Sequence, residues 1–276
     1  ETFIARDLEK LVELGNLDIT IACLKRGRGD LPDNLKPILH KVRLNLIDLL
    51  FSLKYFLVRS EKVKELKRII KGDLTKGAWG KFYLLWKSLG YANILKNYKP
   101  DEIHAHFYSD FSSLGMFVSI ILDVPFSVSA HARDVLEYPH LPKTKAKMAK
   151  FITICNRNAY QRLLKISGAD PEKVHLIYHG IDPKKIFPKQ VDLPKSEDNL
   201  IFMGGTRLTE KKGIEYMIEA SKLLVGRGIQ HRVLLIGPGD LYDELQNKIS
   251  DLGLSEIFEI RGDGKGAPFS EIVQYY

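Results

Sequence analysis

The chain alternates between short apolar runs and stretches whose apolar residues recur at helical spacing. Strands are expected at 17–24, 102–107, 125–130, 151–155 and 174–178. Helices are expected at 2–14, 79–97, 111–122 and 156–166. Because this rhythm is typical of a parallel sheet covered by helices, it predicts an α/β domain.

A second alternation begins after residues 183–198, a stretch with many charges and prolines and no hydrophobic period. Such a stretch is typical of a linker. Strands are then expected at 199–203, 232–236 and 256–260, with helices at 213–226 and 240–252. The pattern therefore predicts an N-terminal domain at 1–182, a linker at 183–198 and a C-terminal domain at 199–276.

The positive charge of the chain is concentrated in one region. The net charge is +8, and residues 36–99 contain 15 Lys or Arg against 4 Asp or Glu. Residues 36–71 form a basic amphipathic region with apolar residues at helical spacing, which predicts an anionic partner or surface. A nucleic acid is an alternative partner, but the region contains no recognisable nucleic-acid-binding motif.

The cysteines and the hydropathy favour a cytoplasmic protein. Cys23 and Cys155 each lie in an apolar run, form no Cys/His motif in the sequence, and are expected to be reduced core thiols. The chain has no Asn-x-Ser/Thr site and no apolar run near 18 residues. It also shows no cluster of metal ligands, so no metal is expected.

A glycine-rich segment before the helix expected at 213–226 is the strongest chemical signal. Gly204 and Gly205 end an apolar run, and Arg207 and Lys212 follow before the helix. Backbone amides near glycines, a helix N-terminus and two cations together predict a diphosphate site. From the spacing alone, a solvated turn with ordinary surface cations is the alternative.

Further motifs follow predicted strands in a fixed order. His106 ends the strand at 102–107, and His131 and Asp134 follow the strand at 125–130. Residues 179–182 read His-Gly-Ile-Asp, with Phe-Pro at 187–188, and residues 234–239 read Leu-Leu-Ile-Gly-Pro-Gly. A lone histidine after a strand is more often structural than functional, so the motifs gain weight from their common order.

In that order the motifs resemble the family 4 (group 1) retaining glycosyltransferases. The resemblance implies the GT-B fold, an α/β architecture with two Rossmann-like parallel-sheet domains facing a cleft. It implies a donor site made of Gly204, Gly205, Arg207, Lys212, Gly237 and Gly239. It places His106, His131 and Asp134 on the acceptor side, and it makes His131, Arg207 and Lys212 the catalytic residues.

The implied reaction transfers a sugar from a nucleotide-diphosphate donor to a glycan or lipid-linked acceptor with retention, in polysaccharide or glycolipid synthesis. The family needs no metal, and the nucleotide-sugar is a substrate, so no cofactor is expected. Two alternatives remain, an epimerase or inverting transferase of the same architecture and a nucleic-acid-binding protein. The protein is expected in the cytoplasm, peripherally at the inner face of an anionic membrane.

The resemblance also predicts that both domains are incomplete. The family's first strand and glycine-rich acceptor loop would precede Glu1, and its Glu-x7-Glu motif would follow Tyr276. Residues 1–276 alone are therefore expected to show no measurable transferase activity.

Overall fold

A computed structural model describes residues 2–23, 33–41, 50, 61–73, 77–181, 200–262 and 264–265. The chain divides into two compact units, Glu1–Gly180 and Ile181–Tyr276. The predicted linker at 183–198 lies outside the described residues, as do the Phe-Pro motif at 187–188 and the stretch 266–276.

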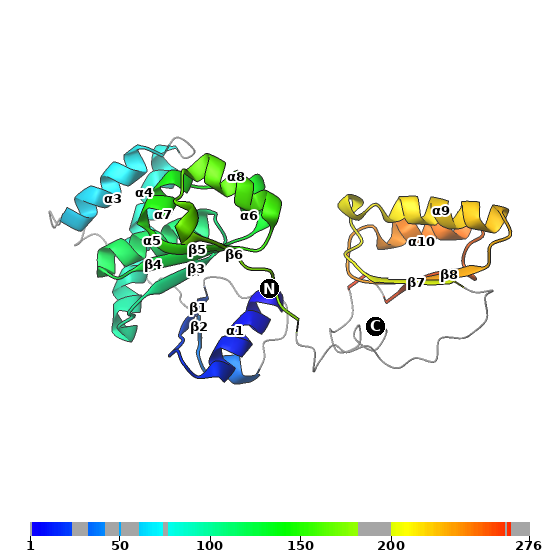
Figure 1. Ribbon diagram of the computed structural model, residues 1–276, viewed down its shortest axis with the longest axis horizontal. Helices are drawn as coiled ribbons and strands as arrows, with labels where there is room; N and C mark the ends of the chain where they lie inside the picture. The colour runs from blue at the N-terminus through cyan, green and yellow to red at the C-terminus, as the bar shows by residue number, and fades with distance from the viewer. Residues whose placement is uncertain are drawn as a thin grey trace. The chain divides into compact units, whose positions relative to one another are not determined.

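The first unit is a parallel sheet with helices between its strands (Figure 1). Its sheet has the order β3-β4-β5-β6, with β3 at Ile103–His106, β4 at Phe126–Ala130, β5 at Ala149–Ile154 and β6 at Val174–Leu176. The longer helices are α3 (Glu61–Lys71), α4 (Ala78–Leu95), α5 (Asp110–Leu122) and α8 (Arg157–Ser167). These strands and α4, α5 and α8 confirm the alternation predicted from the hydrophobic pattern.

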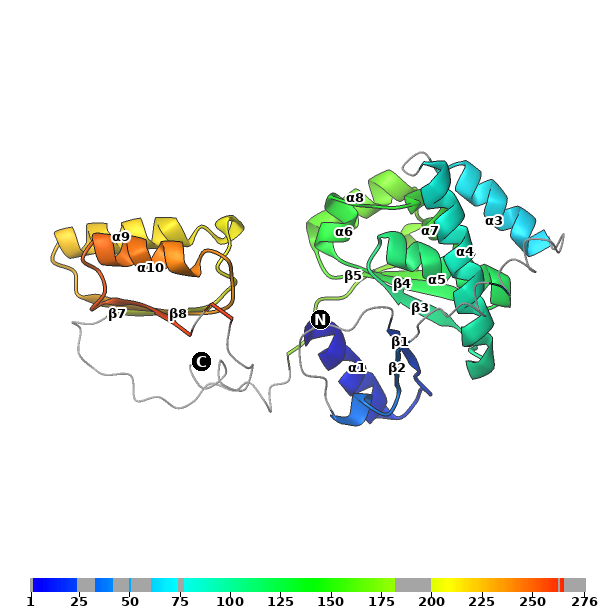
Figure 2. The same ribbon diagram turned by 180° about the vertical axis from the view of Figure 1, so that it is seen from behind.

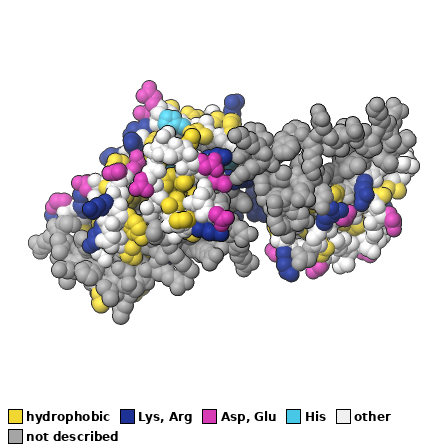
Figure 3. All heavy atoms as spheres, turned by 90° about the horizontal axis from the view of Figure 1, so that it is seen from below, with side chains coloured by type: hydrophobic (Ala, Val, Ile, Leu, Met, Phe, Trp, Pro, Cys, Tyr) yellow, Lys and Arg dark blue, Asp and Glu magenta, His cyan; other side chains and the backbone are white. Residues whose placement is uncertain are grey.

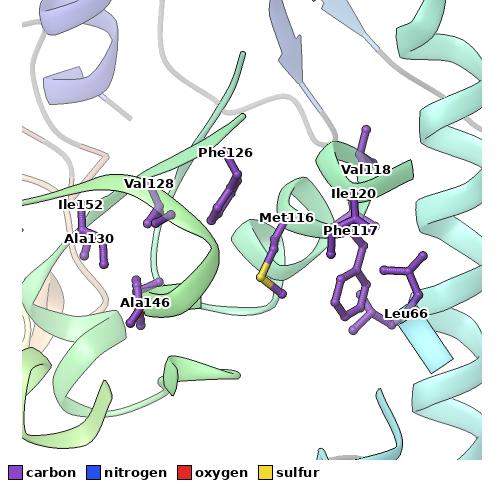
Figure 4. Close-up of a cluster of buried hydrophobic side chains, with 14 of the residues drawn as sticks. Leu66, Met116, Phe117, Val118, Ile120, Phe126, Val128, Ala130, Ala146 and Ile152 are labelled. Atoms are coloured by element: carbon purple, nitrogen blue, oxygen red, sulfur yellow. The ribbon is translucent and has the colours of Figure 1, made fainter. Parts of the chain in front are cut away.

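The apolar face of this sheet carries the core of the unit. Ile103 pairs in register with Phe126, and Ile152 pairs with Val174, so alternate residues of each strand face the helices. Met116 and Phe117 of α5 are fully buried in this core, part of which Figure 4 shows. Full burial of such side chains contributes about 1.5–3 kcal/mol each, so this face stabilises the unit.

Two short helices follow strand ends that the pattern did not mark as helical. They are α6 (Ala132–Leu136) and α7 (Pro142–Met148). Each is shorter than the window over which helical periodicity can be recognised. Pro142 begins α7, where its missing N–H costs nothing.

The start of the chain forms a smaller substructure of α1 (Thr2–Leu14) and two short parallel strands, β1 (Ile21–Cys23) and β2 (Leu39–Lys41). The helical spacing of apolar residues across 36–71 does not produce a helix at its start, where residues 39–41 form a strand. Leu39 pairs with Ile21, and the Ile21 amide donates to the Ile38 carbonyl at 2.9 Å. Sheet pairing outweighs a helical spacing here, while α3 confirms a helix at 61–71.

The second unit is a three-stranded parallel sheet with order β7-β8-β9. Its strands are β7 (Leu200–Gly205), β8 (His231–Ile236) and β9 (Phe258–Arg261). Helices α9 (Ile214–Gly226) and α10 (Tyr242–Asp251) cover the same face of the sheet (Figures 1 and 2). A separate core that includes Ile218, Val233 and Phe258 holds this unit together.

Single-turn 3-10 helices complete the described structure at Asp33–Leu35, Lys96–Tyr98, Pro171–Lys173 and Glu210–Lys212. Within the described residues, no helix is both long and apolar enough to cross a bilayer.

Candidate functional site

A group of histidines lies at the carboxyl edge of the β3–β6 sheet. His106 ends β3, His131 follows β4, and His179 follows β6. The rings of His106 and His131 stack with centroids 6.2 Å apart, and those of His131 and His179 stack at 5.4 Å. Ligands bind at this edge of open parallel sheets, so the topology places the histidines where a site is expected.

Two nitrogens in this stack have no hydrogen-bond partner among the residues that the structure describes. Neither Nδ1 of His106 nor Nε2 of His131 makes a hydrogen bond to any of the described residues, although both atoms are buried. A buried polar atom without a partner costs about 1–3 kcal/mol. Buried polar atoms are almost always satisfied in native proteins, so two exceptions in neighbouring rings indicate a site that binds a ligand.

The environment keeps both rings neutral. Burial, and then the neighbouring histidines, lower the pKa of His106 from its ordinary 6.5 to about 3. Burial and then His179 lower the pKa of His131 to about 4, and Asp7 opposes this shift. A neutral imidazole can accept a hydrogen bond at one nitrogen and donate at the other.

Asp134 holds the loop that carries His131. Its carboxylate accepts a hydrogen bond from the His131 amide at 2.9 Å and another from the Tyr108 amide. Burial raises the pKa of Asp134, and these amide hydrogen bonds oppose that rise. Asp134 therefore ties the segment after β4 to the segment after β3, which fixes the position of His131.

The segment after β3 is strained where it meets His131. Phe107 has a φ of 72°, a left-handed conformation that non-glycine residues rarely adopt, and its ring lies 5.0 Å from that of His131. Such a conformation costs of order 1–3 kcal/mol and persists only where its surroundings enforce it. The Phe107 amide donates to the Ser129 carbonyl at 2.8 Å, which contributes to that constraint.

Helix α1 supplies two further side chains that the sequence analysis did not assign to the site. The Phe3 ring lies 5.0 Å from His131 and 4.5 Å from His179. Asp7 contacts Nδ1 of His179 at 3.2 Å. Phe3 and Asp7 are four residues apart, which places both on one face of the helix. This spacing was the only sign in the sequence that the two side chains could reach the same place.

His104 shares a sheet face with His106 but has a structural environment. Its two ring nitrogens lie 2.8 Å from the hydroxyls of Ser127 and Ser129. Thr153 also donates to the Ser129 hydroxyl at 2.8 Å. The second histidine of the His-x-His sequence, and not the first, therefore remains available for a ligand.

The prediction that Cys155 is a core thiol is wrong. Cys155 follows the last residue of β5 and is a half-buried free cysteine. Its Sγ lies 3.7 Å from Nδ1 of His131. The apolar run that includes Cys155 ends at the sheet edge, so the strand interior is buried and the residue after it reaches the site. The side chain of Cys23 lies outside the described residues.

The predicted donor residues of the second unit lie around the end of β7. Gly204 and Gly205 belong to the strand itself, where they pair with Leu235 and Ile236, so the turn begins only at Thr206. Arg207 is exposed in this turn, and Lys212 is exposed at the end of the 3-10 helix before α9.

The approach to α9 requires a glycine. Gly213 has a φ of +62° and is the N-cap of α9, which begins at Ile214. The left-handed turn after Lys212 redirects the chain into the helix, since this conformation is available to glycine without steric cost. Arg207, Lys212 and the first amides of α9 therefore all belong to the region after β7, as the diphosphate prediction requires.

Gly237 and Gly239 allow two loops to pack against each other. A Cβ at Gly237 would lie 1.7 Å from the Thr206 carbonyl oxygen, and a Cβ at Gly239 would lie 2.1 Å from that of Leu208. The Leu208 amide donates to the Pro238 carbonyl at 2.7 Å. These glycines thus allow the close packing that positions the loop carrying Arg207. This role does not depend on contact with a donor. A Cβ at Gly204, in contrast, would make only an ordinary contact with Leu235.

A hollow of about 410 Å³ lies beside the start of α9. Its lining includes Glu210, Glu215 and Tyr216, together with Lys211, but neither Arg207 nor Lys212. The two carboxylates disfavour the binding of an anion in this hollow. The hollow is therefore not the predicted diphosphate site, and the two cations predicted to bind the diphosphate do not line it.

Comparison with known proteins agrees with this architecture. The family model described as Glycosyltransferase Family 4 matches residues 17–185. The amylovoran biosynthesis glycosyltransferase AmsK of Erwinia amylovora is 33% identical over 116 residues, which are 42% of this chain and 27% of that protein. The first curated relatives are matched over 24%, 27% and 45% of their own length, so the chain spans less than half of each.

Two solved structures share the fold. A glycosyltransferase of Rickettsia africae has a TM-score of 0.55 at 19% identity, covering 83% of this chain and 65% of that one. MurG of Acinetobacter baumannii has a TM-score of 0.55 at 14% identity, covering 98% of this chain and 64% of that one. The predicted α/β fold of the GT-B type is confirmed.

Proposed function

The chain belongs to Glycosyltransferase Family 4, and from this premise we propose that it transfers a sugar from a nucleotide-diphosphate donor to a glycan or lipid-linked acceptor with retention. The acceptor binds beside His106 and His131 in the first unit. The donor diphosphate binds Arg207, Lys212 and the start of α9 in the second. Relatives such as the amylovoran enzyme favour a role in polysaccharide synthesis.

One observation carries this proposal, the pair of buried ring nitrogens of His106 and His131 that make no hydrogen bond within the described residues. Sugar hydroxyls both donate and accept hydrogen bonds. A neutral imidazole can accept a hydrogen bond from a hydroxyl at one ring nitrogen or donate one to it from the other. The low pKa values of the two histidines, about 3 and about 4, keep the rings neutral near pH 7. They therefore suit an uncharged, hydroxyl-rich acceptor better than an anionic one.

The proposed chemistry needs no protein nucleophile. The acceptor hydroxyl attacks the anomeric carbon on the face that the diphosphate leaves, and a diphosphate oxygen takes the hydroxyl proton. The task of the protein is then to stabilise charge on the departing diphosphate, which Arg207, Lys212 and the N-terminus of α9 do electrostatically. His131 orients the acceptor hydroxyl and the donor sugar.

A donor screen with a full-length version of the protein tests the proposal. Nucleotide release is measured with a panel of nucleotide-sugars and sugar-lipid acceptors, and the anomeric configuration of the product is determined by NMR. Retention of the donor configuration is expected. An inverted product would contradict retention, and interconversion of the nucleotide-sugar without transfer would favour the epimerase alternative.

We also propose that the surface of α3 and α4 rests on an anionic membrane, which would bring the enzyme to a lipid-linked acceptor. Helix α3 carries Lys62, Lys64, Lys67, Arg68 and Lys71. Lys62 pairs with Asp123, and Lys64 pairs with Glu61 at 2.5 Å. On the face of the protein that Figure 3 shows, the coloured acidic and basic side chains are intermixed and form no large surface of one charge. The positive charge of this region alone therefore supports membrane binding less strongly than the excess of Lys and Arg in residues 36–99 indicated.

Aromatic residues strengthen the membrane proposal. Trp79 is 85% exposed on the first turn of α4, and Phe82 and Tyr83 are exposed on the next turn. The Lys81 ammonium lies 3.4 Å from the Lys71 carbonyl, so the end of α3 adjoins this aromatic surface. Exposed Trp and Tyr beside lysines are typical of segments that lie in the membrane interface.

A further inference from the structure

Three successive strands of the first sheet bring two histidines and a cysteine together. His131, Cys155 and His179 follow β4, β5 and β6, and one ligand atom from each lies within 4.8 Å of the others. The three residues are far apart in the sequence, so only the parallel topology makes them neighbours.

The ligand atoms of this group face one another. His131 is only 9% exposed, and its Nδ1 lies 3.7 Å from the Cys155 sulfur. Cys155 is a free cysteine. Asp7 contacts Nδ1 of His179 at 3.2 Å, which leaves Nε2 of that ring for a ligand.

The spacing matches the coordination of a small soft cation. Tetrahedral zinc has Zn–S and Zn–N bonds of about 2.3 and about 2.0–2.1 Å, which place a sulfur and a nitrogen ligand about 3.6 Å apart. The Cys155 sulfur and His131 Nδ1 are 3.7 Å apart. A carboxylate on the outer nitrogen of a histidine ligand is the usual second partner in such sites, and Asp7 holds that position for His179.

We propose that His131, Cys155 and His179 bind a divalent transition-metal ion of the zinc class, with one coordination position left open, and that the ion inhibits the enzyme. The inhibition rests on the proposed function, because the ion occupies the ring that would otherwise orient the acceptor. Metal binding itself does not depend on it. The thiolate and two imidazoles favour zinc, copper or cobalt over magnesium or calcium, which prefer oxygen ligands.

Cobalt titration of the 276-residue chain tests the binding. Co²⁺ is added as a spectroscopic substitute for zinc, and the expected result is a thiolate-to-cobalt charge-transfer band together with visible bands of four-coordinate intensity. Cys155→Ser should abolish the charge-transfer band. Cys23→Ser, the matched control at the other cysteine, should retain it. Thermal unfolding of each variant shows whether it is folded.

Histidine variants test the rest of the ligand set. His179→Ala should weaken Co²⁺ binding by at least about tenfold, and Asp7→Asn by about tenfold, the range for loss of a second partner. His175→Ala, at an exposed histidine, should leave binding unchanged. Absence of the charge-transfer band in the unmodified chain, or its survival in folded Cys155→Ser, would overturn the site.

Inhibition is tested separately with a full-length version. Zn²⁺ should reduce sugar transfer reversibly, a chelator should restore it, and Cys155→Ser should be inhibited less relative to its own metal-free rate. Transfer that is unaffected by Zn²⁺, despite a confirmed cobalt spectrum, would overturn the inhibitory role while leaving the metal site and the transferase function in place.

Discussion

At the scale of residues, the proposed acceptor-side residues of the first unit and the proposed donor residues of the second differ in how firmly they are held. The histidines of the first unit are fixed by stacking, by Asp134 and by the strained Phe107. Arg207 and Lys212 of the second unit are exposed side chains on a turn. The first group is therefore preorganised, whereas we expect the second to become ordered when the proposed diphosphate binds.

Removing either cation should impair the chemical step. In a full-length version, Arg207→Ala or Lys212→Ala is expected to lower kcat by roughly 100-fold or more, the effect of losing one group that stabilises developing charge. Lys211→Ala is the matched control, because this neighbouring cation lines the hollow beside α9. Near-normal turnover in both variants, or an equal loss in Lys211→Ala, would refute the diphosphate assignment.

The histidine stack should resist protonation. The folded-state pKa of His106 is lowered to about 3 from an ordinary 6.5, so below pH 6.5 the unfolded chain binds protons that the folded chain does not. The contribution of His106 to the free energy of unfolding is therefore fully present above pH 6.5 and is lost as the pH falls towards 3. The slope of this loss is at most about 1.4 kcal/mol per pH unit.

NMR and chemical denaturation measure this effect. The ring resonances of His106 should not shift between pH 8 and 5, whereas in urea-unfolded chain they should titrate near the ordinary value. His106→Asn should make stability less sensitive to pH between 7 and 5. A His106 resonance that titrates near pH 6.5 in the folded chain would show that the ring is not enclosed as described.

At the scale of elements, α3 and α4 combine cations and exposed aromatic rings at one corner of the first unit. The Trp79 and Phe82 rings lie 6.3 Å apart, and the Lys87 ammonium lies 4.3 Å from the Tyr83 ring centre. The opposite side of α4 is buried, with Leu84, Leu85 and Leu89 in the core. The helix is thus anchored on one side and presents its aromatic residues on the other.

Membrane docking should require both kinds of side chain. Chain binding to vesicles is measured by co-sedimentation and is expected only with anionic lipid, weakening as salt is added. Changing Lys62, Lys64, Lys67 and Arg68 to Gln should reduce binding. Trp79→Ala should weaken it about tenfold, on the scale of burying one large apolar side chain.

An exposed aromatic residue elsewhere controls for a general loss of hydrophobicity. Tyr138 is 63% exposed on the segment after α6, and Tyr138→Ala should bind vesicles as the unmodified chain does. Equal binding to neutral and anionic vesicles, or no binding to either, would remove the membrane proposal.

At the scale of the whole molecule, the two units have separate cores and should respond separately to destabilisation. Gly237→Ala forces a Cβ against the Thr206 carbonyl and should cost about 3 kcal/mol in the second unit. Both tryptophans, Trp79 and Trp86, lie in the first unit. Tryptophan fluorescence should therefore report an unchanged unfolding transition in this variant.

Hydrogen exchange supplies the complementary measurement for the second unit. Amides of β7 and β8 should exchange faster in Gly237→Ala, while those of β4 and β5 should not change. Gly204→Ala is the matched control, because its Cβ would meet only the flexible end of Leu235 at 3.5 Å. Loss of protection in both units together would show that their stabilities are coupled.

Local hydrophobic periodicity by itself determined most of the elements and the fold class. The strands from β3 to β9 and helices α1, α4, α5, α8, α9 and α10 lie close to their predicted ranges. These elements bury alternate or i, i+4 residues, so their pattern is visible in the sequence. Helices α6 and α7 are too short to produce such a pattern, and the strand at 39–41 depends on a partner 18 residues away.

The composition of the site was decided by the tertiary structure. The sequence marked His106, His131 and Asp134 because each lies at or after the end of a predicted strand. It did not indicate that Phe3, Cys155 and His179 lie against His131, or that Asp7 contacts His179. Parallel strands bring their carboxyl ends to one edge however far apart they lie in the chain. Which side chains meet there depends on strand order and register, which local periodicity does not specify.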